Sequence, residues 1–178
     1  MAGFEYRGQL NGSENPVTMD VVIKNSATVA VGDAVYNDAN GITRATSSTE
    51  VLGIVVGIVN ANGIDLDNAP VDTFDGTWTS STQTYVASSD NVTDKKILAK
   101  IIVDPNALFY NDANGDFSNY HKGLLVKLTD HDQIAQSTVS ATVGQFFIVK
   151  LDPDGDADAS KCIVKIAWTQ TLAFEPET

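Results

Sequence analysis

The residues in this chain that are best placed for chemistry are four aspartates at alternating positions of one short segment. They are Asp152, Asp154, Asp156 and Asp158, and Gly155 lies between them. A turn at this glycine would bring the carboxylates together around a hard cation such as Ca²⁺, which takes about six to eight oxygen ligands. The same composition is typical of a solvated acidic turn between two strands, and this second interpretation is favoured.

A second segment, Asp112-Ala113-Asn114-Gly115-Asp116, has a similar spacing of oxygen-bearing side chains. An EF-hand loop requires glycine at its sixth position and glutamate at its twelfth. Counted from the first aspartate of each segment, these positions hold Phe117 and Gly123 in one loop and Ala157 and Ile163 in the other. Neither loop is an EF-hand, so the sequence predicts no resident cofactor, and Ca²⁺ at the Asp152 segment is the one alternative left open.

Histidine offers one further candidate for catalysis. In Asp130-His131-Asp132 an imidazole lies between two carboxylates, which is the pattern of an oriented general base, although a surface histidine in a turn explains it equally well. The other histidine, His121, does not complete a zinc spacing with it. The single cysteine, Cys162, lies in an apolar run and is expected to be a buried hydrophobe. No nucleophile elbow, phosphate loop or paired-cysteine motif is present, so we expect no enzyme.

Aromatic side chains offer a different kind of site, a platform for stacking sugars. Every one of them also lies in an apolar, strand-like run where core packing explains it equally well; the five are Trp78, Tyr85, Phe146, Phe147 and Trp168. A carbohydrate-binding or adhesin β module therefore remains an alternative, as does a Ca²⁺-stabilised extracellular β protein.

The charge balance limits the partners. The 178 residues include 23 acidic and 11 basic side chains, which gives a net charge of −12, and 18 of the acids are Asp. Such a surface disfavours direct contact with nucleic acid or an anionic membrane. The first residues lack the pattern of a signal peptide, and no apolar run reaches the length of a membrane span, so we expect synthesis in a cytoplasm.

The elements that position these residues are predicted to be strands. Val17 to Lys24 alternates between apolar and polar residues, as a half-buried strand does, and Val51 to Val59 is continuously apolar and β-branched, as a strand buried on both faces is. Turn signals recur about every eight to twelve residues, which predicts an all-β sandwich or barrel of about ten short antiparallel strands. We expect residues 1–16 to form an N-terminal arm and 17–178 a β-rich domain, with a subdomain boundary near 60–76.

One hexapeptide, Tyr-Asn-Asp-Ala-Asn-Gly, occurs at residues 36–41 and again at 110–115. Asn-Gly favours a type I′ hairpin turn, which needs a positive φ at both central residues. The repeat therefore predicts two hairpins of related design. The flanking residues diverge, so convergence on a good turn sequence is favoured over duplication.

The first copy lies in a longer string that resembles a known family. Val29-Ala30-Val31-Gly32-Asp33-Ala34-Val35-Tyr36 is followed by Asn40-Gly41-Ile42-Thr43-Arg44-Ala45 and by Val51-Leu52-Gly53-Ile54-Val55. This order is similar to the core of the small, β-rich head decoration (cement) proteins of tailed bacteriophages. The resemblance covers about residues 17–60, a quarter of the chain, and the second half has no matching Gly-Asp string.

The resemblance implies a non-enzymatic structural protein of the virion, bound to the outer surface of the capsid. Its partner would be the major capsid protein. The resemblance also implies assembly as a homotrimer that stabilises the head. On this reading the polar segment 1–16 is an arm that becomes ordered on docking, and Phe4, Tyr6 and Arg7 are its candidate capsid contacts.

Overall fold

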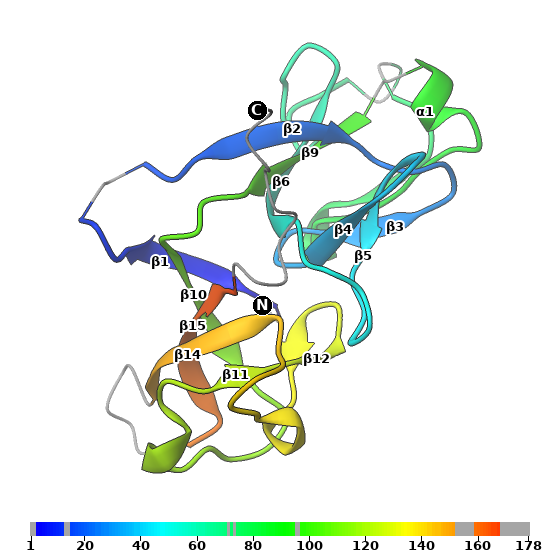
Figure 1. Cartoon of the computed structure of the whole chain (residues 1–178). Helices are drawn as coiled ribbons and strands as arrows, with labels where there is room; N and C mark the ends of the chain where they lie inside the picture. The colour runs from blue at the N-terminus through cyan, green and yellow to red at the C-terminus, as the bar shows by residue number, and fades with distance from the viewer. Residues whose placement is uncertain are drawn as a thin grey trace, which may run out of the picture.

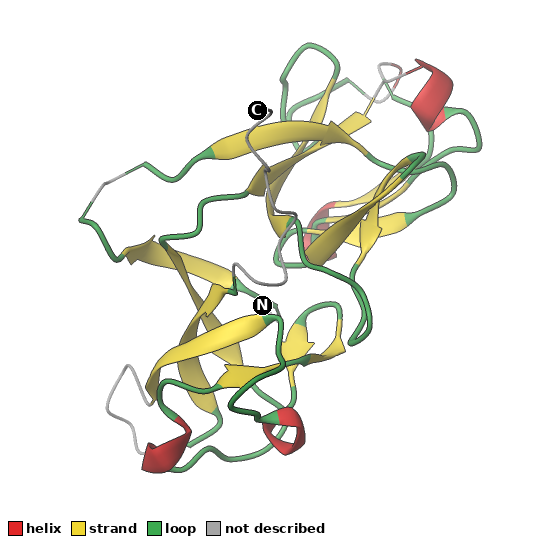
Figure 2. Ribbon diagram, in the orientation of Figure 1, coloured by secondary structure: helices red, strands yellow, loops and turns green. Residues whose placement is uncertain are grey.

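The computed structural model describes residues 3–12, 15–70, 72, 74–94, 97–151 and 159–167, and this part of the chain is all-β. About half of it is strand (47%), and every strand pairing in it is antiparallel. The described residues form fifteen strands, more than the ten predicted, together with one short helix, α1 (Asn91–Asp94), and several 3-10 turns (Figure 2). None of the described helices has the length and apolar character needed to cross a membrane.

Two five-stranded sheets form most of the molecule (Figure 1). Sheet I has the order β2 (Thr18–Val22), β9 (Ile97–Ile102), β6 (Gly53–Asn60), β4 (Ala34–Asp38) and β5 (Gly41–Arg44). A three-stranded sheet of β3 (Thr28–Ala30), β8 (Thr84–Val86) and β7 (Thr77–Thr79) packs with it.

Sheet II has the order β1 (Glu5–Gln9), β10 (Ala107–Asp112), β15 (Lys161–Ile166), β14 (Phe146–Leu151) and β11 (Leu125–Val126). A two-stranded ribbon, β12 (Leu128–Asp130) and β13 (Gln133–Ile134), accompanies it.

The chain crosses between the sheets twice, from β1 to β2 and from β9 to β10. The buried side chain of Asp104, in the second crossing, forms hydrogen bonds to residues on both sides of the first. Its Oδ2 accepts hydrogen bonds from Gln9 Nε2 at 2.7 Å and from the Val17 amide at 3.1 Å, and its Oδ1 accepts one from the Asn106 amide at 2.8 Å. The passage from one sheet to the other therefore occurs at 103–106, and the predicted boundary near 60–76 falls at the end of β6 and before β7.

Two hydrophobic cores fill the molecule, and sheet I contributes to both. One lies between sheet I and the three-stranded sheet, and its members include Ile23, Val35, Val55, Ile58, Tyr85 and Ile101. The other belongs to sheet II, and its members include Phe4, Phe109, Phe146, Ile148 and Val164 together with Val51, Ile54 and Ile102 from the first half. Because β6 is buried on both faces, its side chains are apolar without alternation, as predicted.

The N-terminal segment differs from the predicted arm. Residues 5–9 form β1 in sheet II, where Tyr6 pairs with Phe109 and Glu5 with Tyr110. Phe4 is 3% exposed and stacks on Phe146 with ring centroids 4.7 Å apart. Burial of a phenylalanine stabilises the fold by about 2–3 kcal/mol, which holds the start of this segment on the sheet.

The two hexapeptides adopt different structures. The first forms the β4–β5 hairpin, but the positive φ falls on Gly41 (115°) and not on Asn40, so the predicted type I′ turn is wrong. The second runs along β10 and then leaves it, and Asn114 forms a parallel bridge with Ala135. The prediction of a second hairpin is therefore also wrong, because β10 pairs with β1 and β15 instead of folding back on itself.

A polar cluster between the two sheets

A buried carboxylate, Asp33, is the centre of a polar cluster and follows Gly32 in the turn between β3 and β4. Gly32 has a φ of 93°, which a glycine adopts without strain, and the turn is fixed by the amide of Gly32 donating to the Val55 carbonyl. The Asp33 side chain is only 3% exposed. Its Oδ2 accepts hydrogen bonds from the Ala30 amide at 2.7 Å and from Arg44 Nε at 2.8 Å.

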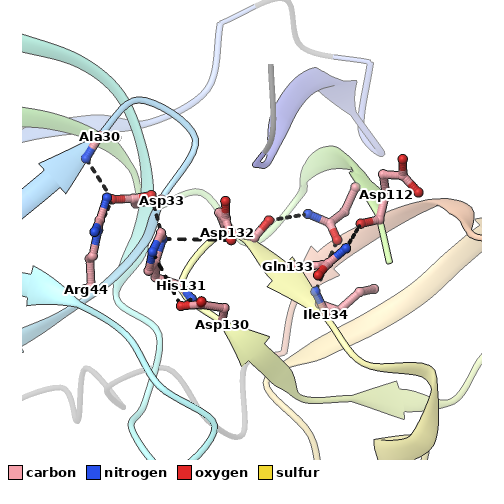
Figure 3. Close-up of polar contacts among 10 residues, drawn as sticks. Ala30, Asp33, Arg44, Asp112, Asp130, His131, Asp132, Gln133 and Ile134 are labelled. Atoms are coloured by element: carbon pink, nitrogen blue, oxygen red, sulfur yellow. Dashed lines mark hydrogen bonds and ion pairs between the residues drawn. The ribbon is translucent and has the colours of Figure 1, made fainter. Parts of the chain in front are cut away.

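His131 reaches the same carboxylate from the other half of the chain (Figure 3). It lies in the turn between β12 and β13, and its Nδ1 is 2.9 Å from Asp33 Oδ1. The backbone strengthens this approach, because the Ala34 amide donates to the His131 carbonyl at 2.7 Å. A hydrogen bond to a buried carboxylate favours the charged imidazole, so Asp33 raises the pKa of His131, and burial of the ring and the Arg44 charge oppose that rise.

The same turn is also fastened to sheet II. The carbonyl of Asp132 accepts a hydrogen bond from Asn111 Nδ2 at 2.9 Å, and Asn111 Oδ1 accepts one from the Ile134 amide at 3.2 Å. Gln133 Nε2 donates to the carbonyl of Asp112 at 2.9 Å. The 130–133 turn thus bridges the Gly32-Asp33 turn and β10, as the two halves of Figure 3 show.

The predicted Asp130-His131-Asp132 pattern therefore exists as a cluster, with additional partners. Asp130 Oδ1 is 3.4 Å from His131 Nε2, and Asp132 Oδ1 is 3.9 Å from Nδ1. Their ligand atoms lie within 4.8 Å of one another, close enough to hold a metal ion. However, Nδ1 already faces Asp33, and this contact raises the pKa of the imidazole, which favours the protonated ring over the neutral ring that a metal ligand or general base requires. The geometry is that of a charge-assisted contact, which links the turn between β3 and β4 to the turn between β12 and β13.

The other predicted site residues do not join this cluster. The four aspartates at 152, 154, 156 and 158 lie outside the described residues. Asp112 Oδ1 accepts a hydrogen bond from Ser160 Oγ at 2.6 Å. His121 Nδ1 accepts one from the Ser118 amide at 3.0 Å and closes a 3-10 turn, which is a structural role. Cys162 is buried, as predicted, and burial raises the pKa of its thiol to about 12.

The three residues predicted as capsid contacts now have definite positions. Phe4 belongs to the core, and Tyr6 packs edge-on against Phe109. Arg7 is the exposed member: it pairs with Glu5 at 3.1 Å and lies over the Tyr110 ring, 5.0 Å from its centroid.

The five aromatic residues do not form a common platform. Tyr85 and Phe146 are fully buried, and Phe147 lies beneath Lys165. Trp168 is outside the described residues. Trp78 is half-buried and lines a surface groove together with Phe74 and Asp67.

Sequence reasoning missed the partners of the Asp33 carboxylate. Asp33 and Arg44 were visible in the Gly-Asp string, and His131 was visible in its own motif. Nothing in the sequence connects them, because Asp33 and His131 are 98 positions apart.

The fold and the cluster together define a class: an all-β protein with two main sheets and two smaller ones, whose halves are linked by the polar network around Asp33 and His131. Comparison with protein-family models, with curated proteins and with solved structures finds no match to this chain.

Proposed function

We propose that this chain is a non-enzymatic structural protein of a phage virion, which binds the outer capsid surface and stabilises the head. The string that resembles decoration proteins supports the proposal, because it forms a connected part of the fold. It runs from β3 through the Gly32-Asp33 turn into β4, β5 and β6, which are neighbours in sheet I, and its residues Ala34, Val51 and Ile54 share a core with sheet II. A protein bound to a capsid is under mechanical stress. The Asp33–His131 contact links the two halves of the chain and would help the fold to withstand that stress.

The observation that carries the proposal is a row of exposed apolar side chains along an edge of both sheets. Leu10 (52% exposed) follows β1, Val17 (59%) precedes β2, and Met19 (43%) lies in β2. These segments meet at Asp104, and β1 and β2 are edge strands of their sheets. Exposed apolar residues at sheet edges are typical of surfaces that bind other proteins.

The row continues the hydrophobic face of β2. Val21 packs partly against the first core and Ile23 is fully buried in it, so the same face of the strand passes from buried to exposed towards Val17. We infer that the major capsid protein covers Leu10, Val17 and Met19, with Arg7 beside them on β1. A homotrimer is the assembly that the resemblance predicts.

The test uses purified virions and matched variants. Mass spectrometry of the particles should find this chain in a fixed ratio to the major capsid protein. Its absence from the particles would refute the proposal. Met19→Glu should then reduce binding to capsids at least tenfold, because it places a charge in the contact. Val143→Glu is the control, since Val143 is similarly exposed (45%) but lies before β14 in sheet II. Equal capsid binding by both variants would show that the contact surface is elsewhere.

A further inference from the structure

A groove beside β7 has the features of a ligand site, and the capsid proposal does not use it. Its volume is about 480 Å³, within the range of roughly 300 to 1,000 Å³ that small-molecule sites occupy. The walls come from the long loop after β6 and from β7 with the turn that follows it. Its lining is Leu66, Asp67, Ala69, Phe74, Gly76, Thr77, Trp78 and Ser80.

Trp78 is held in a fixed orientation at this groove. It pairs with Tyr85 across the β7–β8 ladder, and its half-buried ring packs in part against the first core. Its indole Nε1 donates a hydrogen bond to Asp67 Oδ1 at 2.9 Å. The ring is therefore positioned before any ligand arrives, which removes an ordering cost from binding.

Asp67 provides the polar wall. Hydrogen bonds from Ser80, from Trp78 and from Gln83 lower the pKa of its carboxyl, so this side chain stays ionised at neutral pH. An ionised carboxylate has about four lone-pair positions and accepts hydrogen bonds from several donors at once. Thr77 and Ser80 add hydroxyl groups to the same groove.

We propose that this groove binds a neutral carbohydrate, with one pyranose ring lying on Trp78 and its hydroxyl groups donating to Asp67. An aromatic face suits the apolar C–H face of a sugar, and a few fixed polar groups set its orientation. The carboxylate at the site and the net charge of −12 exclude anionic sugars from this groove. The role is additional to capsid binding, because Trp78 lies on the three-stranded sheet and the apolar row lies on β1 and β2.

A quaternary ammonium ligand is the competing chemistry, since it also favours tryptophan and a carboxylate. Such a cation is bound best when several aromatic faces surround it. The groove offers Trp78 and Phe74, and both are half-buried and pack in part against the first core. Two partly covered rings do not surround a cation, whereas one ring with hydroxyl and carboxylate groups beside it suits a sugar.

The first experiment is a screen of the full chain against an array of neutral oligosaccharides, with choline chloride as the cationic probe. Titration of the best glycan should then give a Kd at least tenfold weaker for Trp78→Ala, with smaller losses for Trp78→Phe and Asp67→Asn. Tyr120→Ala is the control, because Tyr120 is 75% exposed in another part of the molecule and should not affect glycan binding.

Three outcomes would overturn the proposal: no neutral glycan bound at millimolar concentration, equal binding by Trp78→Ala, or binding of choline without binding of any neutral glycan. If Trp78→Ala lowers the melting temperature, saturation transfer from protein to sugar protons, compared between the wild type and Trp78→Phe, decides the question. Weaker transfer in Trp78→Phe supports the site, and equal transfer in the two proteins refutes it. Loss of glycan binding leaves capsid binding intact, so failures of the two proposals are distinguishable.

Discussion

The Asp33–His131 contact should be an energetic coupling between the two sheets that weakens as the pH rises. Asp33→Ala, His131→Ala and the double variant form a cycle that isolates this one contact. Asp33→Ala alone should cost about 3–5 kcal/mol, because it removes three hydrogen bonds to a buried carboxylate and leaves Arg44 without its partner. Effects common to both Asp33→Ala proteins cancel in the cycle.

The size of the coupling follows from the geometry of the pair. A hydrogen bond to a charged group contributes about 1.5–3 kcal/mol net. The His131 side chain is 22% exposed and the Asp33 side chain 3%, so screening by solvent acts mainly on the histidine. We therefore expect a coupling near the lower end of the range, about 1.5 kcal/mol, when the imidazole is charged.

The sign of the pH effect follows from the direction of the pKa shift. The folded protein raises the pKa of His131 above its unfolded value, so below the unfolded pKa both states are protonated and the stabilisation is complete. It is lost as the pH rises through the folded pKa. Asp33 and Asp130 favour the charged ring and Arg44 opposes it, while Asp132 lies 3.9 Å from Nδ1.

The assay is urea unfolding of the four proteins at about pH 5.5, below the ordinary pKa of histidine, and at about pH 9, well above it. The Lys24–Asp38 pair is the matched control, with a 2.7 Å contact near the surface. Asp38 raises the pKa of Lys24 and Lys24 lowers that of Asp38, so both remain charged at both pH values and their coupling should not change. An Asp33–His131 coupling that is equal at the two pH values, or larger at the higher one, would refute the reasoning.

Three further predictions concern the cores. Gly53→Ala should lower the free energy of unfolding in urea by about 2–3 kcal/mol, because a Cβ there would lie 2.5 Å from the Ile102 carbonyl oxygen. Gly57→Ala is the control and should be neutral or slightly stabilising, because its nearest contact is at 3.9 Å. Equal effects of the two substitutions would contradict this packing. Asn91→Ala should cost about 3 kcal/mol by the same assay, since it leaves three buried backbone groups unpaired, and a loss below about 1 kcal/mol would be inconsistent with those bonds. The Cys162 thiol, buried and with its pKa raised to about 12, should react with a thiol reagent only after unfolding, and rapid labelling of the native protein would show that it is accessible.

Local patterns were sufficient to predict the class of fold and several strands. The alternation from Val17 predicted β2, and the continuous apolar run from Val51 predicted a strand buried on both faces, which β6 is. In both cases the residues that decide the structure are neighbours in the chain. The local preferences of the β-branched side chains and turn residues then favour the same structure as the tertiary packing does.

Predictions from local patterns failed where a distant partner decides the conformation. Residues 1–16 are polar and contain three glycines, which predicts an arm. β10, about a hundred positions later, supplies the hydrogen bonds that make residues 5–9 a strand. The second hexapeptide fails for the same reason, because the ladders with β1 and β15 override its hairpin preference. A turn sequence determines which conformations a segment can adopt, and the strands that lie beside it in the fold determine which of them it adopts.

The same competition for partners separates structural from recognition groups in the described part of this protein. His131, which the sequence offered for catalysis, and the charged residues Asp33 and Arg44 have their polar atoms turned towards one another, and a ligand would have to break those bonds to use them. Trp78 and Met19 present apolar surface, at the groove and at the sheet edge, and covering it leaves the hydrogen bond from Trp78 Nε1 to Asp67 in place. A ligand or partner gains free energy by covering surface of this kind without first breaking a buried network. This difference in cost favours recognition at the groove and the edge over chemistry at the cluster.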